Sequence, residues 1–236
     1  MLNREEEAVL SLENAIAYVF KDKSLAVTAL MHSSYSNEHN YSSIDNNERL
    51  EFLGDAVLEL ISSEHIFKNL KDSHEGEMSR TRASYVCEQT LALCAREFHL
   101  EQFILLGKGE EITGGRQRDS IVSDALEAVI GAIYLDGGFT SAKEFIHKFV
   151  LEDIENKKLF YDSKTTLQEM IQENSGKTVR YKLLSQEGPD HDKTFTSAVV
   201  INDEVFTTGI GKSKKLSEQK AAYQAILKLK EVKKRD

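Results

Sequence analysis

The sequence predicts a two-domain protein, in which an all-helical domain, residues 1–154, is followed by a small α+β domain, residues 163–233. Apolar residues recur every three or four positions through the first part, and the single proline, Pro189, lies outside it. Beyond residues 155–162 the period changes to short alternating segments, which are typical of strands. The change of period therefore indicates both the fold class and the division into domains.

The charge of the chain changes at the same place. Residues 162–236 carry 14 Lys and Arg against 11 Asp and Glu, a net charge of +3. The first 161 residues carry 16 basic against 28 acidic side chains, a net charge of −12. An acidic part joined to a mildly basic part indicates two tasks, with the basic part facing a polyanion.

Helices are expected in the first domain wherever the apolar spacing is helical. This criterion selects residues 8–20, 25–34, 47–70, 78–98, 120–136 and 140–155. Gly107, Gly109, Gly114 and Gly115 mark a polar loop, and Gly137-Gly138 fits the end of a helix. An all-helical domain is the consequence.

The second domain is expected to have the order α-β-β-β-α. Residues 155–162 (ENKKLFYD) are charged and lack a clear period, which is typical of a linker. A helix is then expected, followed by three strands and a final helix, over residues 165–174, 179–185, 195–201, 205–210 and 213–233.

Nothing in the sequence predicts secretion or a membrane span. The N-terminus is charged from its fourth residue, and no apolar run approaches the roughly 20 residues that a span requires. Cys87 and Cys94 are expected seven residues apart on one helix, about 10 Å from each other, which is too far for a disulfide. No His or Cys accompanies them at metal-binding spacing, so reduced thiols in a cytoplasmic protein are expected.

Three carboxylates interrupt the apolar pattern of residues 47–70. Glu48, Glu51 and Asp55 have the spacing i, i+3, i+7 and therefore fall on one side of a helix. Like charges at this spacing repel, so a positive group is expected against that side. The alternative is an acidic face exposed to water.

A second acidic pair, Asp124 and Glu127, lies among small apolar residues on another expected helix. Carboxylates in such surroundings tend to be half-buried and to need a partner. If the two helices pack together, Glu51, Asp55, Asp124 and Glu127 converge. An all-oxygen site of this kind suits Mg²⁺, or Mn²⁺ in its place, rather than Zn²⁺. Two unrelated acidic faces remain the alternative.

These residues carry a resemblance to a known family. NERLEFLGDAVL, residues 47–58, resembles the signature of bacterial ribonuclease III almost letter for letter. LMHSSY at 30–35, HEGEMS at 74–79 and DSIVSDALEAVIGAIYLDGG at 119–138 resemble its neighbouring motifs, in the expected order. The resemblance implies a helical, homodimeric endonuclease domain that hydrolyses double-stranded RNA with Mg²⁺.

The resemblance also implies roles for individual residues. Glu51, Asp55, Asp124 and Glu127 match the family's metal-binding carboxylates, and Asp55 and Glu127 match those most directly tied to hydrolysis. Supporting roles in the active site are implied for Glu48 and Glu75. Phe52 resembles an aromatic residue that fits into the partner subunit, although an ordinary core phenylalanine is the alternative. His74 departs from the family, which commonly has proline there.

The expected turn before the last helix is rich in lysine. Lys212, Lys214 and Lys215 lie at a helix N-terminus, which already favours anions, and this pattern is typical of a phosphate clamp. Lysines exposed to water at a helix start are the alternative. Residues 162–230 resemble a double-stranded RNA-binding domain, apart from Ser163 and Ser217, where the family favours tyrosine and alanine.

This second resemblance implies how duplex RNA is held. Such modules contact two minor grooves and the phosphates of the major groove between them. One minor groove is assigned to the first helix, the other to the loop at Pro189 and His191, and the phosphates to the lysines. The first helix contributes Thr165, Gln168, Glu169 and Gln172.

Other polar residues are given no catalytic role. His32, His65 and His147 lack a triad-like pattern and are expected at the surface or hydrogen-bonded in the core. Arg116 and Arg118 are expected to be mobile surface arginines, and contact with phosphate is the alternative.

The leading hypothesis is an Mg²⁺-dependent endoribonuclease that leaves 5′-phosphates, 3′-hydroxyls and short 3′ overhangs. Processing of ribosomal RNA precursors and structured messenger RNA is expected by analogy with the family. A regulator that grips duplex RNA without cutting it and a phosphohydrolase of small nucleotides are the alternatives. The complete carboxylate set opposes the first of these, and the RNA-binding module opposes the second.

Overall fold

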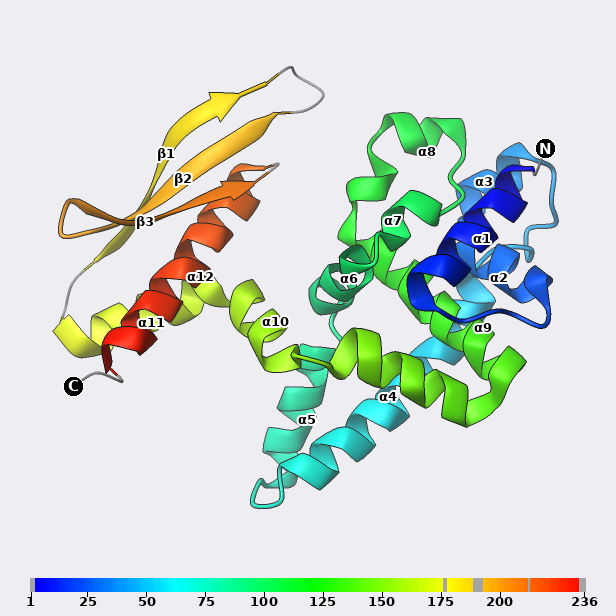
Figure 1. Ribbon diagram of the computed structural model, residues 1–236, viewed down its shortest axis with the longest axis horizontal. Coiled ribbons are helices and arrows are strands. Elements are labelled where there is room, and N and C mark those ends of the chain that lie inside the picture. Colours follow the sequence, from blue (N-terminus) through cyan, green and yellow to red (C-terminus); the bar gives the residue numbers. More distant parts are fainter. Residues whose placement is uncertain (1–2, 176–177, 189–192, 212, 234–236) are drawn as a thin grey trace. The chain divides into compact units, whose positions relative to one another are not determined.

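The structure is a computed structural model of residues 1–236, and it describes residues 3–175, 178–188, 193–211 and 213–233 (Figure 1). The chain divides into two compact units, Met1–Ile154 and Glu155–Asp236. In the described residues, no helix is both long enough and apolar enough to cross a membrane.

The first unit consists of helices and connecting loops, which confirms the predicted class. Its α-helices are α1 Arg4–Ile16, α2 Lys23–Leu30, α3 Ser33–Glu38, α4 Glu48–Asn69, α5 Glu75–Tyr85, α6 Glu88–Glu97, α7 Leu100–Phe103, α8 Lys108–Ile112 and α9 Asp119–Ile146. A short 3₁₀ helix, Gly115–Gln117, precedes α9, and a π-helical turn, His147–Leu151, follows it.

The core of this unit forms around α4 and α9, which pack along each other (Figure 1). Leu58 and Ile61 of α4 are fully buried, as are Leu126, Ile130 and Ile133 of α9. Because α9 is apolar on nearly every side between residues 121 and 133, other helices can surround it. The two carboxylate-bearing helices are thus held together by the main core.

One helix boundary differs from those predicted. Residues 78–98 form two helices rather than one, and the break falls at Val86 and Cys87. Thr90 Oγ1 donates a hydrogen bond to the Ser84 carbonyl at 2.9 Å and so stabilises this corner. The predicted end of a helix at Gly137-Gly138 is confirmed, because Gly138 has a non-helical backbone with a φ of 78° and α9 consists of two helices on either side of this kink.

A carboxylate anchors the chain between α1 and α2. Asp136, near the kink of α9, accepts hydrogen bonds from Tyr18 Oη at 2.6 Å and from the backbone N–H of Asp22 at 2.8 Å. The backbone N–H of Lys21 donates to the same side chain at 3.0 Å. Three donors from one loop therefore converge on a single side chain.

The second unit confirms the predicted α-β-β-β-α order. Its elements are α11 Ser163–Ser175, β1 Val179–Glu187, β2 Thr194–Ile201, β3 Glu204–Gly211 and α12 Lys214–Lys233. The strands form an antiparallel sheet in the order β1-β2-β3, with Val179 opposite Ile201 and Phe195 opposite Gly211. A further helix, α10 Ile154–Tyr161, occupies the predicted linker, where no hydrophobic period had indicated one.

The small core of this unit lies between the sheet and its helices. It contains Leu167 and Ile171 of α11, Val199 of β2, and Ala221, Ala222, Ala225 and Ile226 of α12. At Gly209 of β3 an added Cβ atom would lie 2.3 Å from the backbone nitrogen of Ala221. Glycine therefore allows α12 to lie directly on β3.

Candidate metal and RNA sites

The four predicted carboxylates lie on the two central helices, Glu51 and Asp55 on α4 and Asp124 and Glu127 on α9. The two helices approach each other closely near these residues. An added Cβ atom on Gly131 of α9 would lie only 2.3 Å from the carbonyl oxygen of Leu50 of α4. Glycine at this point brings the backbones into contact. The acidic residues are consequently held at the contact between α4 and α9.

Glu51, Asp124 and Glu127 form an acidic cluster. Each offers one carboxylate oxygen, and these oxygens all lie within 4.8 Å of one another. All three side chains are half-buried. Asp55 is exposed and lies outside this set of three, but its charge acts on Glu127.

The acidic cluster holds excess negative charge. Burial, together with the charges of Asp55, Asp124 and Glu51, raises the pKa of Glu127 to about 8. Burial and neighbouring carboxylates, Asp124 first, also raise the pKa of Glu51. Burial raises the pKa of Asp124 despite a hydrogen bond from Ser123. Half-buried oxygen donors whose charge is uncompensated fit a hard divalent cation.

The supporting acidic residues lie apart from the acidic cluster. Glu48 is exposed at the start of α4, and its charge contributes to the raised pKa of Glu51. Glu75 begins α5, where it accepts a hydrogen bond from Ser79 Oγ at 2.8 Å. It lines a mainly apolar groove between α4 and α5 with Phe67 and Met78. Within one chain, Glu75 is therefore not part of the acidic cluster.

Phe52 is 80% exposed on α4, which excludes the alternative of an ordinary core phenylalanine. Its exposure makes it available to another protein surface.

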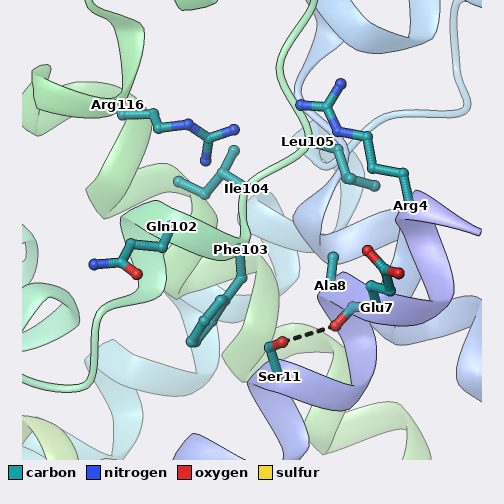
Figure 2. A pocket seen from close by; sticks show the side chains of 9 residues that line it. All are labelled: Arg4, Glu7, Ala8, Ser11, Gln102, Phe103, Ile104, Leu105 and Arg116. Atoms are coloured by element: carbon teal, nitrogen blue, oxygen red, sulfur yellow. Dashed lines mark hydrogen bonds between the residues drawn. The ribbon is translucent and has the colours of Figure 1, made fainter.

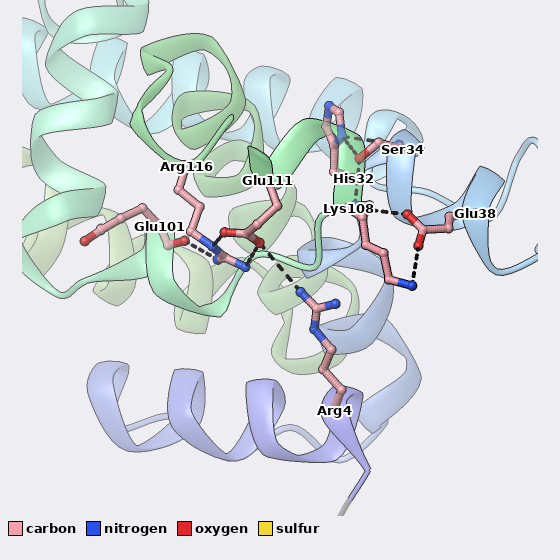
Figure 3. Close-up of polar contacts among 9 residues, drawn as sticks. Arg4, His32, Ser34, Glu38, Glu101, Lys108, Glu111 and Arg116 are labelled. Atoms are coloured by element: carbon pink, nitrogen blue, oxygen red, sulfur yellow. Dashed lines mark hydrogen bonds and ion pairs between the residues drawn. The ribbon is translucent and has the colours of Figure 1, made fainter. Parts of the chain in front are cut away.

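Arg116 is not a mobile surface side chain, contrary to expectation. Its guanidinium donates to both carboxylate oxygens of Glu111, at 2.5 and 2.6 Å, and to the carbonyl oxygen of Glu101 at 2.6 Å. Arg4 approaches the same Glu111 carboxylate at 3.8 Å (Figure 3). Arg118 likewise pairs with Glu110 at 2.6 Å. These arginines fix the loop around α8.

A pocket lies beside this network, between α1 and residues 102–105 (Figure 2). Its volume is about 220 Å³, and Arg4, Ser11, Gln102 and Arg116 contribute to its lining. None of the four predicted carboxylates lines it. The acidic cluster and this pocket are therefore different features of the unit.

The predicted RNA-binding side chains of the second unit lie at its surface where the structure describes them. Thr165, Gln168, Glu169 and Gln172 are all exposed on α11, and Lys214 and Lys215 are exposed at the start of α12. Pro189, His191 and Lys212 lie outside the described residues. The exposed residues thus occupy two separate elements of the module.

The two departures of the second unit from its family are accommodated by hydrogen bonds. Ser163 is fully buried, and its hydroxyl donates to the carbonyl oxygen of Gln219 at 3.0 Å. Ser217 is also fully buried, and its hydroxyl lies 2.7 Å from that of Ser197. Neither buried hydroxyl lacks a partner, so both substitutions are compatible with the core.

Comparison with known proteins agrees with both halves of this description. A family model described as Ribonuclease-III-like matches residues 22–154, and one described as Double-stranded RNA binding motif matches residues 163–229. A protein named Ribonuclease 3 from Caldanaerobacter subterraneus is 48% identical over 221 residues, covering 92% of this chain and 96% of that protein. The chain belongs to the ribonuclease III family.

Other relatives support the same assignment. A Ribonuclease 3 of Streptococcus pneumoniae is 46% identical over 219 residues, covering 92% of this chain and 94% of that protein. The solved nuclease domain of the Campylobacter jejuni ribonuclease III is 42% identical, with a TM-score of 0.57, and covers 62% of this chain and 99% of that one. As a member of this family, the chain is an endoribonuclease that acts on double-stranded RNA. Members of the family generally depend on a metal, and the acidic cluster matches that requirement.

Sequence reasoning missed one feature of this site. The contact of Gly54 and Gly131 was not anticipated, although glycine inside a helix is itself a signal of close packing. His32 meets its expectation, because its half-buried ring is hydrogen-bonded to Ser34 at the start of α3.

Proposed function

We propose that this ribonuclease III uses Mg²⁺, which Mn²⁺ can replace, to cut both strands of duplex RNA. The products carry 5′-phosphates and 3′-hydroxyls with short 3′ overhangs. The observation that supports the proposal most strongly is the convergence of Glu51, Asp124 and Glu127, whose pKa values are all raised, chiefly by burial. A regulator that only binds RNA has no use for these half-buried carboxylates, whose burial is unfavourable in free energy.

Glu51, Asp55, Asp124 and Glu127 would hold the cation. A divalent cation at this position lowers the pKa of a water molecule and stabilises negative charge on a phosphoryl oxygen. Hydrolysis joins the water oxygen to phosphorus and breaks the bond to the 3′ oxygen, which takes up a proton. Glu127 is the first proposed catalytic residue; burial and the neighbouring carboxylates raise its pKa to about 8 in the metal-free chain, so a bound cation would offset an unfavourable charge there. Asp55 is the second proposed catalytic residue.

The second unit would supply affinity for the duplex. The acidic residues of the first unit repel phosphate, so a separate surface that binds the RNA backbone is useful. The exposed polar side chains of α11 are proposed for one minor groove, and Lys214 and Lys215 for phosphates. His191 and Lys212 keep their proposed RNA contacts on the basis of sequence alone.

We propose a homodimer as the active form, with Phe52 at the interface. The exposure of this side chain supports the proposal, as does the Campylobacter jejuni nuclease domain, which has a region involved in dimer formation. A two-fold axis would allow one metal site to face each strand of the duplex. Glu75 is then proposed to support a site through the dimer rather than within its own chain.

The physiological assignment extends the same proposal. We expect the enzyme to process precursors of ribosomal RNA, transfer RNA and structured messenger RNA in the cytoplasm. A reducing compartment agrees with the reduced thiols expected for Cys87 and Cys94.

The proposal is tested by incubating the purified chain with a long RNA duplex in Mg²⁺ and in EDTA. Glu127→Gln removes the charge at the acidic cluster, and Glu144→Gln, an exposed residue of the same helix, is the matched control. The native chain and the control should cut in Mg²⁺ only, whereas Glu127→Gln should bind RNA without cutting it. Binding without cutting by the native chain would favour the regulator instead.

A further inference from the structure

Two histidine rings meet where α4 faces the end of α9. The rings of His65, on α4, and His147, at the start of the π-helical turn, have centroids 5.5 Å apart and planes inclined by 59°. Both side chains are half-buried. Around α4, His65 lies within roughly 20° of Gly54 and of the fully buried Leu58, which belong to the side packed on α9. The rings therefore meet at a packed contact between helices.

An ion pair holds the same two segments together. Lys143 Nζ lies 2.5 Å from Oε2 of Glu64, the residue before His65. The backbone N–H of His147 donates to the carbonyl oxygen of Lys143, so one helical turn separates these two residues and places them on one side of the helix. The ion pair and the ring pair thus join the same parts of α4 and α9, which limits the freedom of the rings to separate.

The backbone at His147 has an unusual conformation. His147 begins a π-helical turn, which is closed by a hydrogen bond from the N–H of Glu152 to the His147 carbonyl oxygen at 2.9 Å. Such turns are rare, and they are found frequently at functional sites. A rare backbone conformation therefore coincides with one of the two rings.

The separation of the rings fits two ligands of one metal ion. A Zn²⁺ ion binds histidine nitrogen at about 2.0–2.1 Å with tetrahedral angles, which places the centroids of two coordinating rings roughly 5 Å apart. Simple packing of two aromatic rings is the alternative, because it allows separations of about 4.5–7 Å. An experiment with metal distinguishes the two.

The lysines beside the rings are engaged by other groups. Glu64 pairs with Lys68 as well as with Lys143. Lys148, the neighbour of His147, places its Nζ atom 4.7 Å from the centroid of the Phe149 ring. The negative charge of Glu64 offsets part of the positive charge near the rings, which reduces the repulsion of a cation.

We propose that His65 and His147 form a second metal site, which binds one Zn²⁺ ion, or another transition-metal cation, through two imidazole nitrogens and water. Imidazole suits Zn²⁺, Ni²⁺ and Cu²⁺, whereas the oxygen donors of the acidic cluster suit Mg²⁺ and Mn²⁺. The two sites therefore select different metals. An ion bound by both rings joins α4 to the part of α9 beyond the kink at Gly138, and it stabilises the folded chain.

The first measurement follows the ring nitrogens of the native full chain by NMR, with signals assigned through the bonded backbone. Zn²⁺ is added at about pH 8, because a metal binds the neutral form of imidazole, and Mg²⁺ is present in excess to occupy the acidic cluster. Equimolar Zn²⁺ should shift the signals of His65 and His147 together. The ring of His99, which is 67% exposed, should not shift at this ratio.

The second measurement compares Zn²⁺ affinities by calorimetric titration. His65→Gln and His147→Gln should each weaken binding by at least about tenfold, because a single ring loses the advantage of joint binding. His99→Gln is the matched control, and Glu127→Gln, which alters the acidic cluster, should bind Zn²⁺ like the native chain. Zn²⁺ should also raise the melting temperature of the native chain more than that of His65→Gln. A shift of only one of the two rings, or native Zn²⁺ affinity in both His65→Gln and His147→Gln, would overturn the inference and leave a simple ring contact.

Discussion

A Cβ atom added to Gly54 would lie 1.8 Å from the carbonyl oxygen of Glu127, so α4 and α9 are in backbone contact beside the acidic cluster. Gly54 is flanked in sequence by the carboxylates of α4, and Glu127 is itself a member of the cluster. The same contact therefore sets the separation of the helices and the separation of the charges. The packing of α4 on α9 and the convergence of the acidic cluster therefore both depend on glycine at this contact.

Gly54→Ala should be strongly destabilising. The added methyl group cannot fit against the backbone of α9, and we expect the free energy of unfolding to fall by at least about 3 kcal/mol. Chemical denaturation measures this change. The control is Gly76→Ala on α5, where a Cβ atom has no neighbour within 4 Å. That substitution should stabilise the chain by about 0.5–1 kcal/mol, because alanine is the better helix former. Equal stability of the native chain and Gly54→Ala would contradict the close contact.

The metal-free protein should lose stability as the pH rises from about 4.5 to about 8. Burial and carboxylate neighbours raise the pKa of Glu127 to about 8, from its ordinary value of 4.5. A raised pKa means that the folded state binds the proton more tightly, so this stabilisation is complete below pH 4.5 and lost above 8. Melting temperatures in EDTA should show the decline, and Mg²⁺ should reduce it. Glu127→Gln should melt higher than the native chain in EDTA at pH 8, but not at pH 4.5.

The stability of the loop between α1 and α2 should depend on the hydrogen bonds that it donates to Asp136. Burial opposes the charge of this carboxylate, but hydrogen bonds from Tyr18, Asp22 and Lys21 outweigh it and lower the pKa of Asp136. The stability that the Asp136 carboxylate contributes is therefore present above its ordinary pKa of 3.8, and it is lost as the pH falls through the lowered pKa. Tyr18→Phe should cost about 1.5–3 kcal/mol at neutral pH, as expected for a hydrogen bond to a charged group. Denaturation of Tyr18→Phe and Asp136→Asn, singly and together, tests whether the two effects are coupled.

Local sequence patterns predicted which residues form the acidic site better than they predicted how the two helices bring these residues together. The spacing of Glu51 and Asp55, and of Asp124 and Glu127, follows directly from helical geometry. The convergence of Glu51, Asp124 and Glu127 required the contact of Gly54 and Gly131, which depends on residues far apart in the chain.

Two elements of the fold were predicted wrongly for local reasons. The break at Cys87 has no glycine or proline to indicate it, and it is stabilised by side-chain hydrogen bonds. The helix α10 lacks a clear hydrophobic period. The class and order of both units were nevertheless predictable, because most of their helices and strands keep one apolar face.

The lysines at the start of α12 should control the salt dependence of RNA binding. Each phosphate contact releases a counterion, so losing one lysine should reduce the slope of log K against log salt by about one. Lys214→Ala, Lys215→Ala and the variant with both substitutions are made in the full chain. They are compared with Lys182→Ala on β1, a lysine that is also exposed. Fluorescence anisotropy with an uncut duplex, in Ca²⁺ or EDTA, gives the slopes. An unchanged slope in the variant that lacks both lysines would contradict their phosphate contacts.

Phe52→Ala should dissociate the proposed homodimer without unfolding the protomer. The side chain is 80% exposed in the single chain, so its removal costs the protomer little. At an interface, burial of a phenylalanine contributes about 1.5–3 kcal/mol, and a symmetric dimer loses two such contributions. Analytical ultracentrifugation of Phe52→Ala should show monomers, whose fraction falls as the protein concentration rises. The circular dichroism spectrum should be unchanged. Ile112→Ala, at an 85% exposed residue of α8, is the matched control. A Phe52→Ala chain with the native dimer constant would place the interface elsewhere.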